Sequence, residues 1–84
     1  MTIEKENTEK VELLIRQEAE KRNRSIQEIT WLDIAAGPDI RLKVRFDGRI
    51  EYLTLNRDNI EFFLVAEWHE DFIRSAIIEM LEKP

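Results

Sequence analysis

Apolar and polar residues alternate most clearly between Ile40 and Leu55, in the stretch IRLKVRFDGRIEYLTL. Two alternating runs flank the pair Asp47-Gly48, and a period of two is typical of strands that bury one face. An Asp-Gly pair between two such runs is a strong signal for a β-hairpin. We therefore expect a hairpin over 40–55 whose apolar side needs a covering layer.

The register of this hairpin can be argued from its charges. A two-residue loop pairs Val44 with Glu51, which sets a charge opposite a core residue. A three-residue loop over 46–48, with its glycine in the left-handed bulge position, pairs Val44 with Ile50 and sets Lys43 opposite Glu51. Because a slip of one residue moves every side chain to the opposite face, we predict the three-residue loop.

Helical spacing precedes the hairpin. Apolar residues at i, i+3, i+4 and i+8 form one stripe: Val11, Leu14, Ile15 and Ala19. This stripe predicts a helix over about 8–22, with Asn7 or Thr8 as its N-terminal cap. The polar residues 1–7 are expected to be frayed.

Residues 25–36 read SIQEITWLDIAA and allow two interpretations. Ser25 and Glu28 have the spacing of a capping box, and Gly37-Pro38 could end a short helix that runs from Ile26 to Ala36. The β-branched and aromatic residues of ITWLDI instead favour a strand. Because a lone two-stranded hairpin is marginal in water, we predict a third strand over about 27–35 and keep the helix as the alternative.

The segment after the hairpin carries two apolar stripes at helical spacing. The first is Ile60, Phe63 and Leu64, and the second is Phe72, Ile73, Ala76, Ile77, Met80 and Leu81. The stripes diverge in angle, which predicts helices over about 57–66 and 69–82, the first capped by Asn56 or Asp58. One long bent helix is the alternative, since no Pro or Gly marks the break. The chain is thus predicted to be one small α+β domain over 1–84, with an N-terminal helix, a three-stranded antiparallel meander and one or two C-terminal helices.

Composition narrows the function classes. Of the 84 residues, 43% are hydrophobic and 37% are charged, which indicates one folded domain with a densely ionic surface. The formal net charge is −5, but residues 21–57 hold eight bases against five acids. An acidic protein with a basic middle argues against a general nucleic-acid binder and leaves room for a local basic patch. The absence of cysteine excludes disulfides, thiolate zinc sites and a cysteine nucleophile.

The sequence also predicts a location. The stretch MTIEKENTEK lacks the apolar segment of a signal peptide. The apolar runs are a few residues long, against the roughly 20 that span a bilayer. We expect a soluble, cytoplasmic protein of a bacterial type.

Basic residues alternate along the first hairpin strand and therefore share one face. In the predicted register two leucines of the second strand lie on that face. If the first strand forms, either Ile29 and Trp31 or Thr30, Leu32 and Ile34 join them. The candidate interaction surface is Arg41, Lys43, Arg45, Arg49, Leu53, Leu55 and Trp31. Cations beside rings could hold phosphates while a ring stacks on bases. We favour the simpler interpretation, in which their long stems cover apolar neighbours on a solvated sheet face.

Other candidates for chemistry are weak. The single histidine, His69, is flanked by Glu67, Glu70 and Asp71, but it lacks the His-Glu-x-x-His spacing that places two metal ligands on one helical face. The serines show no glycine elbow of the kind that exposes a nucleophile. We therefore expect no enzyme activity, no metal or other cofactor and no small-molecule substrate.

The element order and the segment after the hairpin each show a limited resemblance to known proteins. The predicted α-β-β-β-α order resembles the double-stranded-RNA-binding fold in element order alone, because acids stand where that fold has a lysine-rich helix start. The hairpin followed by Asn56-Arg57-Asp58 resembles several small bacterial proteins of unknown function, which implies no chemistry. Our leading hypothesis is a non-enzymatic protein–protein interaction or regulatory module, with a homodimer as one form of it. The alternative is a nucleic-acid-binding module that uses the basic hairpin face.

Overall fold

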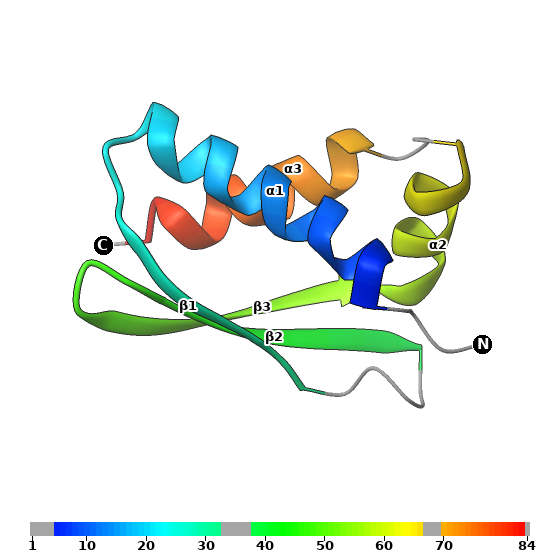
Figure 1. Ribbon diagram of the computed structural model, residues 1–84, viewed down its shortest axis with the longest axis horizontal. Helices are drawn as coiled ribbons and strands as arrows, with labels where there is room; N and C mark the ends of the chain where they lie inside the picture. Colours follow the sequence, from blue (N-terminus) through cyan, green and yellow to red (C-terminus); the bar gives the residue numbers. More distant parts are fainter. Residues whose placement is uncertain (1–4, 33–37, 67–69, 84) are drawn as a thin grey trace.

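The computed structural model describes residues 5–32, 38–66 and 70–83. Three helices lie on one side of a three-stranded antiparallel sheet whose strand order is β1-β2-β3 (Figure 1). The elements in chain order are α1 (Lys5–Lys21), β1 (Ile26–Trp31), β2 (Asp39–Phe46), β3 (Arg49–Asn56), α2 (Arg57–Ala66) and α3 (Glu70–Leu81). The predicted α+β architecture is confirmed.

The boundaries of the elements differ from the predictions in particular places. Helix α1 begins at Lys5, about one turn before the predicted start, so the proposed caps Asn7 and Thr8 lie inside the helix. Segment 26–31 is a strand and not the alternative helix, although residues 33–35 of the predicted strand lie outside the described residues. Helix α2 has the predicted bounds, and Asn56 is its cap, since Asn56 Oδ1 accepts from the backbone N–H of Asp58 at 2.9 Å.

The C-terminal segment forms two helices. Helix α2 ends at Ala66 and α3 begins at Glu70, so the predicted division into two helices is confirmed. The predicted break falls on residues 67–69, which are outside the described part of the chain. His69 is one of these residues.

The hairpin between β2 and β3 has a two-residue loop, so the predicted three-residue loop is wrong. Phe46 pairs with Arg49 and Val44 with Glu51. Asp47 and Gly48 have φ angles of 52° and 77°, the left-handed pair that a type I′ turn requires. This turn matches the right-handed twist of the flanking strands, which favours it over the bulged loop.

Residues from outside the hairpin hold this turn in place. Asp47 Oδ1 accepts from the backbone N–H of Ser25 at 2.9 Å, and Asp47 Oδ2 accepts from Arg24 at 3.1 Å. Both bonds lower the pKa of Asp47 below its ordinary value, and the bond from Ser25 has the larger effect. Glu51, whose charge was the reason for predicting the other register, is half-buried and has an ion-pair partner. It lies 3.8 Å from Nζ of Lys83, just beyond the end of α3.

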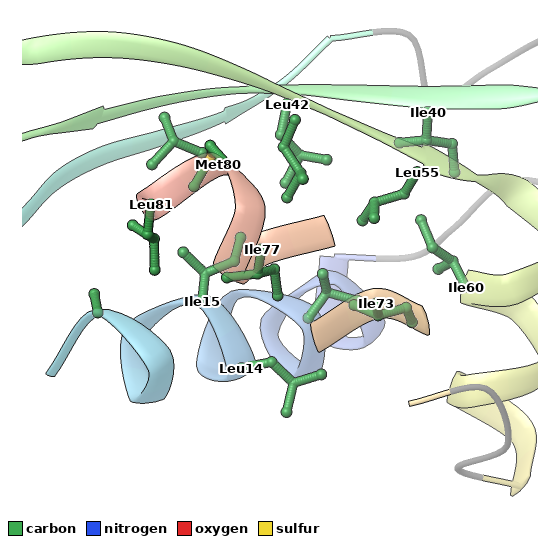
Figure 2. Close-up of a cluster of buried hydrophobic side chains, with 14 of the residues drawn as sticks. Leu14, Ile15, Ile40, Leu42, Leu55, Ile60, Ile73, Ile77, Met80 and Leu81 are labelled. Carbon is green, nitrogen blue, oxygen red and sulfur yellow. The ribbon is translucent and has the colours of Figure 1, made fainter. Parts of the chain in front are cut away.

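The core lies between the sheet and the helices. Four alternate residues of β2 are fully buried: Ile40, Leu42, Val44 and Phe46. In Figure 2 the strand side chains Leu42 and Leu55 point toward Ile77 and Ile73 of α3 and Ile15 of α1. Burial of such a side chain contributes roughly 1.5–3 kcal/mol, so this layer supplies most of the stability of a small domain.

A buried carboxylate joins α1 to α3 on the helical side. Glu18 is only 4% exposed, and it accepts hydrogen bonds from Arg74 of α3 at 2.8 Å and from Arg22 at 2.7 Å. Burial alone would raise the pKa of Glu18, but the bonds from Arg74 and Arg22 and the charge of Lys21 outweigh it and lower the pKa below its ordinary value. Glu18 therefore remains a carboxylate at neutral pH and fixes the two helices in register.

Candidate interaction surface

One face of the sheet is left open, because α1, α2 and α3 all lie on the other side (Figure 1). Side chains alternate along each strand, so the strand register determines which residues reach this face. The open face, as we use the term below, consists of Glu28, Thr30, Leu32, Asp39, Arg41, Lys43, Arg45, Ile50, Tyr52 and Thr54. Within the described part of the chain, no helix covers it.

The basic residues form the central row of the open face, because β2 lies between the other two strands. Lys43 pairs with Thr30 on β1 and with Tyr52 on β3. Arg45 pairs with Glu28 on one side and with Ile50 on the other. Lys43 and Arg45 are therefore flanked by polar side chains on β1 and by an aromatic and an aliphatic side chain on β3.

The row on β3 exposes large apolar side chains. Tyr52 is 50% exposed and Ile50 is 42% exposed. The Arg41 guanidinium lies 5.6 Å from the centroid of the Tyr52 ring, a cation–π contact. This contact joins the basic row on β2 to the apolar row on β3.

The three cations of the open face take part in none of the ion pairs found among the described residues. Arg22, Arg24 and Arg74, in contrast, are each paired with a carboxylate. The charges are also divided between the layers. The three helices hold ten acids and six bases, a balance of −4, whereas the strands hold three acids and four bases, a balance of +1.

The structure brings together only part of the predicted surface. Arg41, Lys43 and Arg45 share the open face, as their alternation indicated. Arg49 does not join them, because it pairs with Phe46 on the side that faces the helices. Its guanidinium lies 4.9 Å from the Phe46 ring centroid, and its Nη2 donates to the Lys83 carbonyl oxygen at 2.6 Å.

Three apolar residues of the predicted surface also face the helices. Leu53 and Leu55 are 3% and 4% exposed and belong to the core, so their predicted place beside the cations is wrong. The cause is the two-residue loop, which shifts β3 by one residue and turns Tyr52 outward in place of Leu53. Trp31 pairs with Leu42 on the buried side, and its Nε1 donates to Glu12 of α1 at 3.0 Å.

The residues that sequence reasoning missed are Ile50, Tyr52 and Thr54. A signal for them was present, because the Asp-Gly pair is typical of the two-residue loop that turns them outward. No group of three His, Cys, Asp or Glu residues that could hold a metal ion occurs among the described residues.

Comparisons with known protein-family models, with curated proteins and with solved structures found no match to this chain. Among the described residues, no helix has both the length and the apolar character needed to cross a membrane.

Proposed function

We propose that this protein is a protein–protein interaction module that binds an acidic partner protein through its open face. The observation that carries the proposal is the row of three cations on the central, uncovered strand. They form no ion pair with any residue that the structure describes, and exposed Tyr52 and Ile50 flank them. Arg and Tyr are enriched where protein interfaces derive most of their binding energy. A flat sheet face with a charged row and an apolar row provides both attraction and contact area.

A protein partner is favoured over a nucleic acid by the surrounding charges. Glu28 and Asp39 lie on the same face as the cations, and the helical layer adds a balance of −4. A phosphate backbone would meet these acids along its length, whereas a folded protein can place its carboxylates opposite the cations alone. The cation–π pair of Arg41 and Tyr52 is the one feature that would also suit stacked bases.

The test uses a defined probe and a matched pair of variants. The probe is a fluorescein-labelled peptide of alternating glutamate and leucine, and its binding is followed by fluorescence anisotropy at 20 mM and 150 mM salt. The open-face variant carries Lys43→Glu and Arg45→Glu. The control carries Lys10→Glu and Arg16→Glu, which make the same change in net charge at exposed positions of α1.

We expect the open-face variant to weaken binding on the order of 10-fold or more, because two favourable charge contacts of about 0.5–1 kcal/mol each become repulsive. The control should weaken it about 3-fold at most, through long-range repulsion that salt screens. Equal losses in the two variants would refute the open face as the binding surface. A labelled single-stranded DNA that binds more tightly than the peptide, with the same loss in the open-face variant, would replace the protein partner by a nucleic acid.

A further inference from the structure

The outer edge of β3 has unpaired main-chain groups. The backbone N–H of Leu32 donates to the Arg41 carbonyl, which shows that the odd-numbered residues of β2 bond to β1. The even-numbered residues of β2 therefore bond to β3, and the main-chain groups of Ile50, Tyr52 and Thr54 point away from the sheet. None of these three residues makes a backbone hydrogen bond outside the sheet within the described ranges.

This edge has no short strand, bulge or proline, three of the devices that keep a strand from pairing with another chain. Inward-pointing charges are another such device, and β3 has two, Arg49 and Glu51, which both contact Lys83 of the same chain. The opposite edge, β1, has six residues and a bulge between Ile26 and Glu28. Strand β3 has eight residues and a continuous register with β2, and its edge residues include exposed Ile50 and Tyr52.

Helix α3 borders the same edge and adds a self-complementary pair of charges. A groove of about 210 Å³ separates β3 from α3, with Thr54 on one wall and Ala76, Glu79 and Lys83 on the other. The helix runs antiparallel to β3, since Arg49 at the start of the strand donates to the carbonyl of Lys83 beyond the end of the helix. Glu79 of the helix and Lys83 just beyond its end both line the groove, so an acid is followed by a base along the edge. Lys83 Nζ also lies 3.8 Å from Glu51 of its own chain.

We propose that a second copy of this chain pairs with β3 in the antiparallel direction about a twofold axis, forming a continuous six-stranded sheet. Identical strands are complementary in this arrangement, because each offers the same alternating donors and acceptors. With Tyr52 at the axis, Ile50 of each copy lies opposite Thr54 of the other. The two α3 helices then run side by side in opposite directions, and Glu79 of each copy faces Lys83 of the other.

The second copy is favoured over an unrelated strand by this reciprocity of charge. An isologous interface needs a surface that complements itself, and an acid followed by a base along the edge satisfies that condition when two helices lie antiparallel. Phe72, which is 65% exposed one turn before Ala76, extends the same helical stripe with apolar surface. This inference goes beyond the proposed function and does not depend on it, since it uses the main-chain edge of β3 and not the cations of the open face.

The first test is sedimentation equilibrium of the whole chain from 1 to about 500 μM at 150 mM salt. We expect the mass to rise with concentration from 10.1 kDa to twice that value. Thr54→Pro removes an N–H that points away from β2, so it should leave the hairpin paired and abolish the rise in mass. Thr54→Val keeps the N–H and should dimerise as the native chain does. A native chain of 10.1 kDa at every concentration would overturn the proposal and leave the edge to a strand of another protein.

A charge exchange provides the second test and does not depend on how well the proline variant folds. Glu79→Lys gives a copy with two bases at the contact, and Lys83→Glu gives a copy with two acids. Each alone should dimerise at least 10-fold more weakly than the native chain. An equimolar mixture should recover dimers, because every contact across the axis then joins an acid to a base. A mixture that dimerises no better than the separate variants would overturn the proposed pairing, even if the native chain forms a dimer.

Discussion

Replacement of adjacent residues on β3 separates the observed hairpin register from the alternative. Leu53 faces α3 and is 3% exposed, whereas Tyr52 is on the open face and is 50% exposed. With a three-residue loop the two residues would exchange faces. We predict that Leu53→Ala destabilises the protein far more than Tyr52→Ala does.

The magnitudes follow from the surroundings of each side chain. Truncation of a buried leucine to alanine costs about 2–5 kcal/mol, depending on how far the site can relax. Leu53 lies on an edge strand beside the groove that Ala76 and Met80 line, so its neighbours can move into part of the vacated space. We therefore expect about 2–3 kcal/mol. Tyr52→Ala loses a cation–π contact with Arg41 and some strand preference, together about 1 kcal/mol.

Urea unfolding followed by far-ultraviolet circular dichroism measures both changes. A chain of this size has a free energy of unfolding of about 4–12 kcal/mol, so both variants should be folded in water. The leucine variant should melt roughly 8–24 °C lower than the native chain, with the urea slope unchanged. Measurements at low micromolar concentration keep self-association out of the comparison. A Tyr52 variant less stable than the Leu53 variant would refute the two-residue loop.

Three further predictions concern single contacts, and each is checked by the same urea titration. Gly48→Ala should cost about 1 kcal/mol of stability, because a φ of +77° strains any residue with a side chain, although no atom lies within 4 Å of the added carbon. An unchanged urea midpoint would contradict the turn geometry. Asn56→Ala should cost about 1 kcal/mol of stability, because it removes the cap of α2. Asp58→Ala should not show this loss, because the cap bonds to the backbone N–H of residue 58, which the substitution keeps. Glu18→Gln should cost about 1–3 kcal/mol at pH 7. Because folding lowers the pKa of Glu18, its carboxylate contributes fully to stability at neutral pH, and this contribution is lost as the pH falls below about 4. The difference in unfolding free energy between the variant and the native chain should therefore shrink at pH 3. A difference that stays constant with pH would show that the charge of Glu18 is not its source.

The local pattern of apolar and polar residues was sufficient to predict most of the helices and strands and part of the open face. The stripe that includes Val11 and Ile15 and the alternation along β2 each predict an element within a few residues, because one buried face requires that period. The same alternation places Arg41, Lys43 and Arg45 together. These inferences need no knowledge of distant residues.

The errors arose where distant residues decide the outcome. Sequence alone predicts that Glu51 would be a charge among apolar side chains in the two-residue register. Its ion-pair partner, Lys83, lies at the far end of the chain. The turn is likewise held by Ser25, which precedes the sheet. The face of Trp31 depends on the register of β1 against β2, which the bulge after Ile26 displaces. Sequence spacing within a strand carries no information on these contacts.

The central position of β2 determines how the open face can recognise anything. Both edges of β2 are hydrogen-bonded, and its other side is the fully buried row of the core. The backbone beneath the three cations cannot shift without breaking both ladders, so a partner meets a rigid base that requires only side-chain ordering. Such a base lowers the entropic cost of association. For the proposed protein partner, a rigid base implies a surface that already matches a gently twisted plane, so the proposed recognition depends on shape as well as on charge.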